Sequence, residues 1–462
     1  MVRPPQGGAA RLPLVLDRSL RKAYGRGREA RTFPWRKGGP VHQRRHFLPL
    51  TVGVFTLLIA VTVGLIRAPI ASVADAKTPI KIGVLAPLTG PLAALARDIV
   101  DGARLYVDEV KGEMAGRKVE LTVEDYEFKT AVALTKTKKL VERDRVHVVV
   151  GVILSAAAIA MKDYLHAQQV PFIVSGAAVA EPLMMEKPSP YVFRTTFAAS
   201  QVPTPLAKFT YDKLKARTAT VIAGDTVGTI ELVMGFARAF EEAGGKVVQE
   251  IYTPIGTTDF GPFIGRLRRD VDVVAVLVPG DDGIRFINQY EEFGLKGKIQ
   301  VVDTAPGITD ISLLPSSGPA ALGMYASQPY VYTIDNPQNR KFVQAVRAKY
   351  GRDPGGPAEA TYVALAAIHQ ALTATGGNIE DKAKFLEALR HMDLEAPRGH
   401  IRFDKYQNVI TDVIITRIDK VGDQIVPVVV ETIPGVEQFL GITPEEYLKR
   451  PRLVALKGTF GK

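Results

Sequence analysis

Short runs of β-branched and aliphatic residues alternate with longer amphipathic segments from residue 80 onward, and this alternation limits the possible folds more than any other feature. Runs at 80–85, 119–123, 146–150 and 171–174 predict buried strands. The segments between them, among them 130–145 and 155–169, predict helices. Strands separated by helices of this length need crossover connections, so we expect a parallel sheet.

The same pattern starts again at residue 219. It predicts strands at 219–223, 246–252, 271–278 and 299–302, with helices at 229–243, 259–269 and 281–293. Further helices are predicted at 336–350, 357–375 and 379–392, and β segments at 401–403, 413–418 and 425–430. Two successive series predict an α/β protein with two lobes, each built on a doubly wound parallel sheet. A chain of 462 residues is long enough for both lobes plus extensions.

The first 76 residues hold nearly all of the net charge of +11: they contain 13 Lys+Arg and 3 Asp+Glu, against 46 and 45 in the remainder. The body is thus nearly neutral, which removes the main argument for a nucleic-acid partner. The run Arg44-Arg45-His46-Phe47-Leu48 matches the core of twin-arginine export signals, and an apolar stretch at 49–66 follows it. We predict export to the periplasm or another extracytoplasmic compartment, with cleavage near Ala76 after a small-x-small site. The alternative is a retained N-terminal membrane anchor.

Motifs of the common enzyme and metal classes are missing from the body. The chain has no cysteine, which excludes disulfides, thiolate metal sites and a cysteine nucleophile. The turn after the first strand, 86–90, reads A-P-L-T-G rather than G-x-G-x-x-G, and no phosphate loop or G-x-S-x-G elbow occurs. The body histidines show no metal-ligand spacing (His147, His166, His369, His391 and His400). We therefore predict a protein that is not an enzyme and needs no cofactor.

The loops that follow the predicted strands are the expected ligand site, because ligands of parallel α/β sheets bind outside the carboxyl ends of the strands. Ser155 is the sharpest candidate, since it follows a strand and opens a helix. Its hydroxyl and backbone N–H are placed to hold a ligand carboxylate, and the alternative is that Ser155 only caps its helix. The adjacent carboxylates of Asp281 and Asp282 open another helix, where their charges favour the helix dipole.

Five segments resemble those of a known family. They read I-K-I-G-V-L-A-P-L-T-G at 80–90, F-R-T-T at 193–196, T-D-F-G-P-F at 258–263, Q-Y-E-E-F-G-L at 289–295 and P-R-G-H-I-R-F-D at 397–404. In this order they make the body, 78–432, resemble the type I periplasmic binding proteins. The resemblance is strongest to the leucine/isoleucine/valine-binding family of ABC transporter receptors.

The resemblance implies two lobes that close on a small molecule about a hinge in which the chain crosses three times. Lobe one would comprise 78–199 and 328–395, and lobe two 200–327 and 396–432, with a C-terminal tail at 433–462. It also implies an inner-membrane ABC permease as partner.

The ligand loops of the family match this chain unevenly. Ser155 matches the serine that holds the ligand carboxylate. Val179 stands where the family has a threonine, and Pro306 stands where its amino-acid receptors have an acidic residue. In the family, that threonine and that acidic residue hold the α-ammonium group of the ligand. Val227 replaces the aromatic residue of the family's Tyr-Gly pair. The candidate ligand-binding residues are Ser155, Ala156, Ser175, Ala177, Val179, Thr89, Val227, Asp281 and Pro306.

These replacements predict a small hydrophobic or aromatic carboxylate without an α-amino group as the ligand, because burying an unpaired ammonium group costs several kcal/mol. Asp281 or Asp282 would keep an amino acid possible if either restored the missing charge. A branched-chain amino acid is therefore the first alternative. A membrane-anchored ligand sensor of the same fold is the second.

Overall fold

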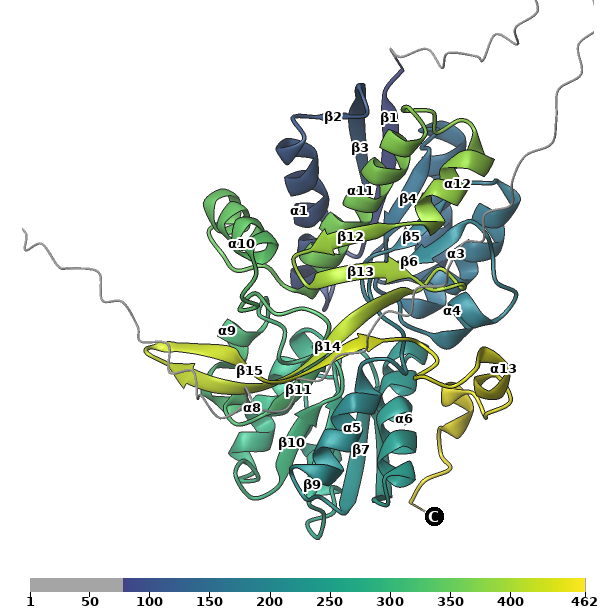
Figure 1. The fold of residues 1–462 in the computed structure, drawn as a ribbon. Helices are drawn as coiled ribbons and strands as arrows, with labels where there is room; N and C mark the ends of the chain where they lie inside the picture. Colours follow the sequence, from purple (N-terminus) through teal and green to yellow (C-terminus); the bar gives the residue numbers. More distant parts are fainter. Residues whose placement is uncertain (1–77, 462) are drawn as a thin grey trace, which may run out of the picture. The chain divides into compact units, whose positions relative to one another are not determined.

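The computed structural model describes residues 78–461, and two β-sheets organise this part of the chain (Figure 1). The first sheet has the strand order β2-β3-β1-β4-β5-β6. Its strands are β1 (Ile80–Ala86), β2 (Glu113–Met114), β3 (Arg117–Asp125), β4 (Val148–Gly151), β5 (Phe172–Val174) and β6 (Val192–Arg194). All neighbours except the β2–β3 hairpin run parallel, which confirms the predicted parallel sheet.

Helices cover both faces of the first sheet. Ile80, Ile82 and Val84 of β1 face a core shared with α1, α11 and α12, whereas Leu85 faces a core shared with α2, α3 and α4. This split follows from the alternating direction of side chains along a strand. The covering helices are α1 (Ala93–Glu109), α2 (Thr130–Lys138) with a π-helical turn (Lys139–Arg143), α3 (Ser155–Ala167), α4 (Glu181–Met185), α11 (Gly356–Ala374) and α12 (Lys382–Arg390). Helix α10 (Pro337–Tyr350) packs on α1 and α11 instead.

The second sheet has the order β12-β13-β14-β11-β10-β9-β7-β8, with β15 paired to β14. Its strands are β7 (Thr218–Gly224), β8 (Lys246–Thr253), β9 (Val273–Leu277), β10 (Gln300–Asp303), β11 (Tyr325–Gln328), β12 (Asp393–Ala396), β13 (Gly399–Phe403), β14 (Val409–Val421) and β15 (Gln424–Val436). Helices α5 (Pro203–Asp212) and α6 (Val227–Glu242) pack on one face, and α7 (Gly261–Gly265), α8 (Asp281–Glu292) and α9 (Leu314–Ser317) on the other.

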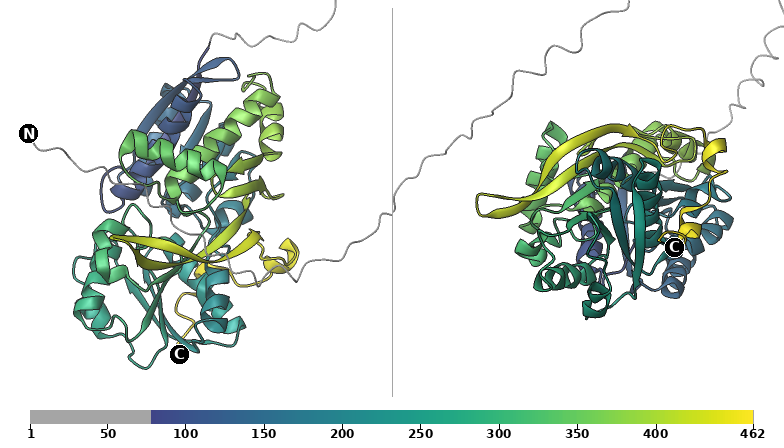
Figure 2. Two further views of the ribbon diagram at one scale, coloured as in Figure 1. Left: turned by 60° about the vertical axis from the view of Figure 1, so that its left-hand side comes forward. Right: turned by 90° about the horizontal axis from the view of Figure 1, so that it is seen from below.

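The second sheet has the predicted parallel strands at its centre, and the C-terminal β segments add antiparallel strands to it. Only β7 to β11 run parallel, because β14 returns antiparallel to β11 and forms a long hairpin with β15. In Figure 2 this hairpin projects beyond the other strands of the sheet. Strands β6 (Val-Phe-Arg) and β11 (Tyr-Ala-Ser-Gln) were not predicted, because both are short and contain polar residues that interrupt an apolar run. The helix expected at 259–269 shortens to α7.

The chain passes between two packed lobes three times. Lobe one is the first sheet with α1–α4 and α10–α12, and lobe two is β7–β11 with α5–α9. The last passage lies within β14: Val409 packs in the core of lobe one, and Val413 in the core of lobe two. We expected it near residue 396. It comes later because β12 and β13, although bonded into the second sheet, bury Ile401 and Phe403 in lobe one.

The predicted export leader lies outside the described residues. This applies to the twin-arginine run, the apolar stretch at 49–66 and the cleavage position near Ala76. Between residues 78 and 461, none of the helices has both the length and the apolar character that crossing a bilayer requires.

Candidate functional site

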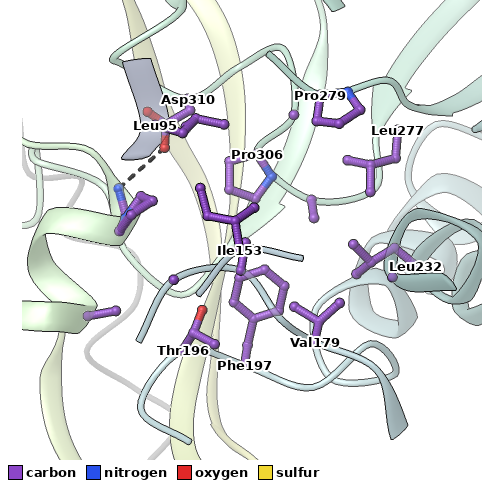
Figure 3. Close-up of a pocket in the computed structure, with 18 of the residues that line it drawn as sticks. Leu95, Ile153, Val179, Thr196, Phe197, Leu232, Leu277, Pro279, Pro306 and Asp310 are labelled. Atoms are coloured by element: carbon purple, nitrogen blue, oxygen red, sulfur yellow. Dashed lines mark hydrogen bonds between the residues drawn. The ribbon is translucent and has the colours of Figure 1, made fainter. Parts of the chain in front are cut away.

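A cavity of about 90 Å³ lies where the loops of both lobes meet (Figure 3). Lobe one supplies the start of α1, the loops after β4, β5 and β6, and the start of α11. Lobe two supplies the start of α6 and the loops after β9, β10 and β11. The pocket therefore lies outside the carboxyl ends of the strands, as expected for parallel α/β sheets.

Most of the pocket wall is apolar. Figure 3 shows Leu95 beside Asp310 at one side of the cavity, and Val179 and Leu232 at the other. The apolar lining residues are Leu92, Leu95, Phe128, Ile153, Leu154, Ala177, Val179, Phe197, Leu232, Leu277, Pro279, Ala305, Pro306, Pro329, Pro357 and Ala360. Such a wall favours a hydrophobic ligand body, with orientation set by a few polar groups.

Ser155 is one of these polar groups, and its hydrogen bonds fix the role of its hydroxyl. The Ser155 Oγ accepts the backbone N–H of Val179 at 3.1 Å and of Ala180 at 3.3 Å. With both acceptor positions in use, the hydroxyl hydrogen is free to donate into the pocket. Ser155 does not cap its own helix, since Leu154 is the N-cap and makes no side-chain cap. The capping alternative for Ser155 is therefore wrong.

The backbone that Ser155 contacts is held from its other side by a buried arginine. Arg194 is fully buried, and its Nη1 donates to the carbonyl oxygens of Val179 at 2.7 Å and Ala180 at 3.2 Å. Asn408 in turn accepts from Arg194 Nε at 2.6 Å. The loop after β5 is thus fixed at both its N–H and its carbonyl groups, which makes the position of Ser155 rigid.

Two helix N-termini meet at Ser155. This residue is the first of α3 in lobe one, and Gly228 is the second of α6 in lobe two. A Cβ built on Gly228 would lie 2.6 Å from Ser155 Oγ, so only glycine permits this approach of the lobes. Both helix ends direct positive dipole ends and unpaired backbone N–H groups at the same place, which favours an anionic ligand group.

Positive side chains contribute little to the charge of the pocket. Arg398 is the single basic residue among the described residues that line it. Its Nε donates to Glu359 Oε2 at 2.7 Å, its Nη2 contacts the same oxygen, and its Nη1 donates to the carbonyl of Thr195 at 3.1 Å. Because Glu359 neutralises the guanidinium, hydroxyls and helix dipoles remain as the groups that attract an anion.

Pro306 also lines the pocket, on a loop that one buried carboxyl shapes. Asp303, at the end of β10, accepts through Oδ2 the backbone N–H groups of Gly307 at 3.0 Å, Ile308 at 2.8 Å and Thr309 at 3.0 Å. Burial raises the pKa of Asp303 to about 7. These bonds set the turn that presents the Pro306 ring, rather than a polar group, to the cavity.

Asp310 is the one acidic side chain among the described lining residues, and it joins the two lobes. Its Oδ1 accepts the Ser312 N–H at 2.9 Å and hydroxyl at 2.6 Å, and its Oδ2 accepts the Gly356 N–H of lobe one at 3.3 Å. Asp98 of α1 lies close by and pairs with Arg352 at 2.5 Å. Burial raises the pKa of both carboxyls, that of Asp98 to about 7. The protein's own donors thus already occupy both oxygens of Asp310.

The candidate residues divide into two groups. Ser155, Ala177, Val179 and Pro306 line the cavity together. Five others are not among its lining residues: Ala156, Ser175, Thr89, Val227 and Asp281.

Specific contacts explain two of these placements, and exposure explains a third. The exposed Thr89 hydroxyl donates to Asp125 at 2.8 Å, and the buried Ser175 hydroxyl accepts from Thr361 at 2.9 Å. Asp281 is exposed, and its neighbour Asp282 is engaged by Arg285 at 2.9 Å and by the Gly256 N–H at 2.6 Å. Neither aspartate therefore restores a charge at the pocket.

Some lining residues were not among the candidates. Thr196, just after β6, presents its hydroxyl oxygen toward the cavity in Figure 3. Gln328 ends the unpredicted strand β11 and Tyr330 follows it, and Arg398 comes from the turn between β12 and β13. The sequence contained one signal for Thr196, the F-R-T-T segment, but nothing in it indicated that its second threonine faces a ligand.

Known proteins share this architecture. A family model described as periplasmic binding protein matches residues 79–423. The Leu/Ile/Val-binding protein homolog 6 of Brucella melitensis is 32% identical over 345 residues, which cover 73% of this chain and 87% of the relative.

Solved structures give the same result. An ABC transporter substrate-binding protein from Sphaerobacter thermophilus is 36% identical with a TM-score of 0.73, over 78% of this chain and 99% of its own. A solute-binding protein of an ABC transporter from Rhodopseudomonas palustris was solved with 3,4-dihydroxybenzoic acid. It is 27% identical with a TM-score of 0.74, over 79% of this chain and 99% of its own. The chain therefore belongs to the periplasmic binding protein family, whose members are extracytoplasmic proteins that bind small molecules for ABC transporters and are not enzymes.

Proposed function

We propose that this chain binds a small hydrophobic or aromatic carboxylate between its lobes and delivers it to an inner-membrane ABC permease. The Ser155 hydroxyl is the observation on which the proposal rests. Two backbone N–H groups use its lone pairs, so its hydrogen must go to an acceptor such as a carboxylate oxygen. A ligand ammonium group, which only donates, could not pair with it.

The surroundings of Ser155 also favour a negatively charged ligand group. The N-termini of α3 and α6 converge there, and Arg398 is neutralised by Glu359. A hydroxyl and two helix dipoles suit a single negative charge better than a strongly charged anion, which would need a free cation.

The apolar remainder of the pocket supports a ligand without an α-amino group. Val179 and Pro306 line the cavity. The family resemblance implies that amino-acid receptors hold the ligand's ammonium group at these two positions. Asp310, the acid at the wall, accepts bonds from Ser312 and Gly356. An ammonium group buried here would lack a dedicated partner, which costs several kcal/mol.

Cavity size supports a compact ligand. The volume of about 90 Å³ is of the order of the ~150 Å³ apolar cavity that holds one benzene molecule in another protein. One ring or one short branched chain fits this scale. The relative from Rhodopseudomonas palustris, solved with a dihydroxybenzoic acid, is consistent with an aromatic acid.

A thermal-shift screen tests the proposal, because a ligand that binds only the folded state raises the melting temperature. The acid arm contains benzoate, 4-hydroxybenzoate, phenylacetate and 4-methylpentanoate, and the amino-acid arm contains leucine, valine and phenylalanine. Stabilisation by members of the acid arm, with no response to the amino acids, is expected. Stabilisation by leucine or valine alone would replace the proposal by branched-chain amino acid binding.

We further propose that the leader directs export by the twin-arginine route and is cleaved near Ala76. The run Arg44-Arg45-His46-Phe47-Leu48 before the apolar stretch supports this. N-terminal sequencing of the protein from the periplasmic fraction checks it. A start near Lys77 is expected, whereas an intact leader in the membrane fraction would favour the anchored alternative.

A further inference from the structure

The C-terminal segment 437–461 lies beyond the family match, which ends at residue 423. It follows β15 and contains α13 (Pro444–Tyr447) and a 3₁₀ turn (Leu453–Leu456). Figure 1 shows α13 in yellow beside α4 of lobe one and α6 of lobe two. Its contacts with each lobe are specific enough to define a function.

Segment 437–461 holds lobe one at α4. The Tyr447 hydroxyl donates to Glu181 Oε1, and the Leu453 N–H donates to Glu181 Oε2 at 3.4 Å. Arg452 forms an ion pair with Glu186 just after the helix. The Tyr447 ring is 3% exposed and packs with Phe439 against Met185.

The same segment holds lobe two at α6 and β8. Arg238 Nη2 of α6 donates to the Tyr447 hydroxyl oxygen at 2.7 Å, so one hydroxyl links both lobes. Leu453 is fully buried in the core beneath α5 and α6. Glu250 of β8 accepts the N–H groups of Gly458 and Phe460, each at 2.7 Å.

The lobe-one anchor, Glu181, lies close to the ligand pocket. Glu181 follows the pocket residue Val179 by two positions, and its own N–H donates across the lobes to Glu231 of α6 at 2.7 Å. Glu231 lies one turn from Gly228, at the pocket end of α6. If the lobes separate at this edge, Glu181 must leave Glu231, and either Glu181 or Arg238 must release Tyr447.

We propose that residues 437–461 form a clasp that favours the closed arrangement of the lobes even without ligand and slows the opening that ligand exchange requires. The inference rests on the proposed function only in that the lobes open and close around a solute. It does not depend on which solute binds.

Tyr447→Phe tests the clasp, because it removes the shared hydroxyl and keeps the ring that packs on Phe439. The chain has no cysteine, so cysteines introduced at the exposed residues Lys118 of lobe one and Lys246 of lobe two are the only thiols to which a fluorophore pair can be attached. Energy transfer between them reports the interlobe distance of the ligand-free protein. Loss of about one hydrogen bond predicts a three- to tenfold rise in the open population.

Two further variants make the result decisive. Arg452→Gln breaks a half-exposed ion pair to lobe one without touching the core, so it remains informative if Tyr447→Phe fails to fold, and it should open the protein in the same direction. Buried Leu453 and the Gly458 and Phe460 bonds to Glu250 fasten the segment to lobe two, so we expect it to move with lobe two when the lobes separate. Lys457→Gln breaks a bond to Asp225 within that moving unit and should leave the distances unchanged. Interlobe distances of Arg452→Gln and folded Tyr447→Phe that match the wild type would overturn the clasp. Failure of every carboxylate to bind would leave this test unaffected.

Discussion

The Ser155→Ala substitution removes a hydroxyl that has two separable effects in this structure. In the free protein it takes away the acceptor of the Val179 and Ala180 N–H groups, which are bonded at 3.1 and 3.3 Å. In the complex it takes away the donor to the ligand carboxylate. The two effects are therefore measured as two quantities, stability and affinity.

The magnitudes follow from the type of each bond. Leaving a buried N–H group without an acceptor costs about 1–3 kcal/mol, so the free energy of unfolding should fall by about that amount. A hydrogen bond to a charged group contributes about 1.5–3 kcal/mol, so the Kd for the carboxylate should rise about 10- to 150-fold.

Urea unfolding gives the first quantity and calorimetric titration with the bound acid the second. Ser175→Ala is the matched control: its hydroxyl is equally buried and bonds Thr361 at 2.9 Å, but Ser175 is not a lining residue. It should lose similar stability and keep its Kd within about twofold. An unchanged Kd in Ser155→Ala, alongside the expected loss of stability, would show that the hydroxyl only organises the loop and would refute the reasoning.

Three more substitutions test other parts of the account. Pro306→Glu places a carboxylate where the family resemblance implies that amino-acid receptors have one, so calorimetry should show tighter binding of leucine and weaker binding of simple acids. Gly228→Ala should weaken acid binding at least tenfold, because its Cβ would lie 2.6 Å from the Ser155 oxygen. Burial, aided by a neighbouring glutamate, raises the pKa of Glu231 to about 8, well above its ordinary value of 4.5. The folded protein then holds a proton that the unfolded chain releases, so stability falls as pH rises from about 5 to 8. Glu231→Gln should lose less stability over that range in urea unfolding.

Each of these has an outcome that contradicts it. Leucine binding that does not improve in Pro306→Glu would mean that this position does not face the ligand. For Gly228, the control is Gly265→Ala at the end of α7, where an added Cβ meets nothing within 4 Å, and equal affinities in both variants would argue against a close approach of the lobes. Identical pH profiles of wild-type protein and Glu231→Gln would show that Glu231 does not titrate in this window.

The sequence was sufficient for most of the fold because the signals are local. Strand β9 is an unbroken apolar run, β1 is apolar apart from Lys81, and the helices between the strands show helical periodicity. Strand β11 reads Tyr-Ala-Ser-Gln and β6 has three residues, so neither has a pattern long enough to recognise. Strand β6 takes its place beside β5, and β11 lies between β10 and the distant strand β14.

The site was predictable only in part for the same reason. Ser155 and Pro306 follow recognised strands, so their position near the pocket could be deduced from strand ends. The direction of a side chain within a loop could not: Thr89 turns to Asp125, and Ser175 turns to Thr361. Both partners are far away in sequence, and nothing local to either residue indicates them.

The central claim is that this receptor selects a carboxylate and rejects an α-ammonium group. Leucine and 4-methylpentanoate share one carbon skeleton and one carboxylate, and differ only in the amino group. Calorimetric titration of the mature protein with this pair therefore isolates the claim. We predict that 4-methylpentanoate binds at least tenfold more tightly than leucine, and tighter binding of leucine would contradict selection against the α-ammonium group.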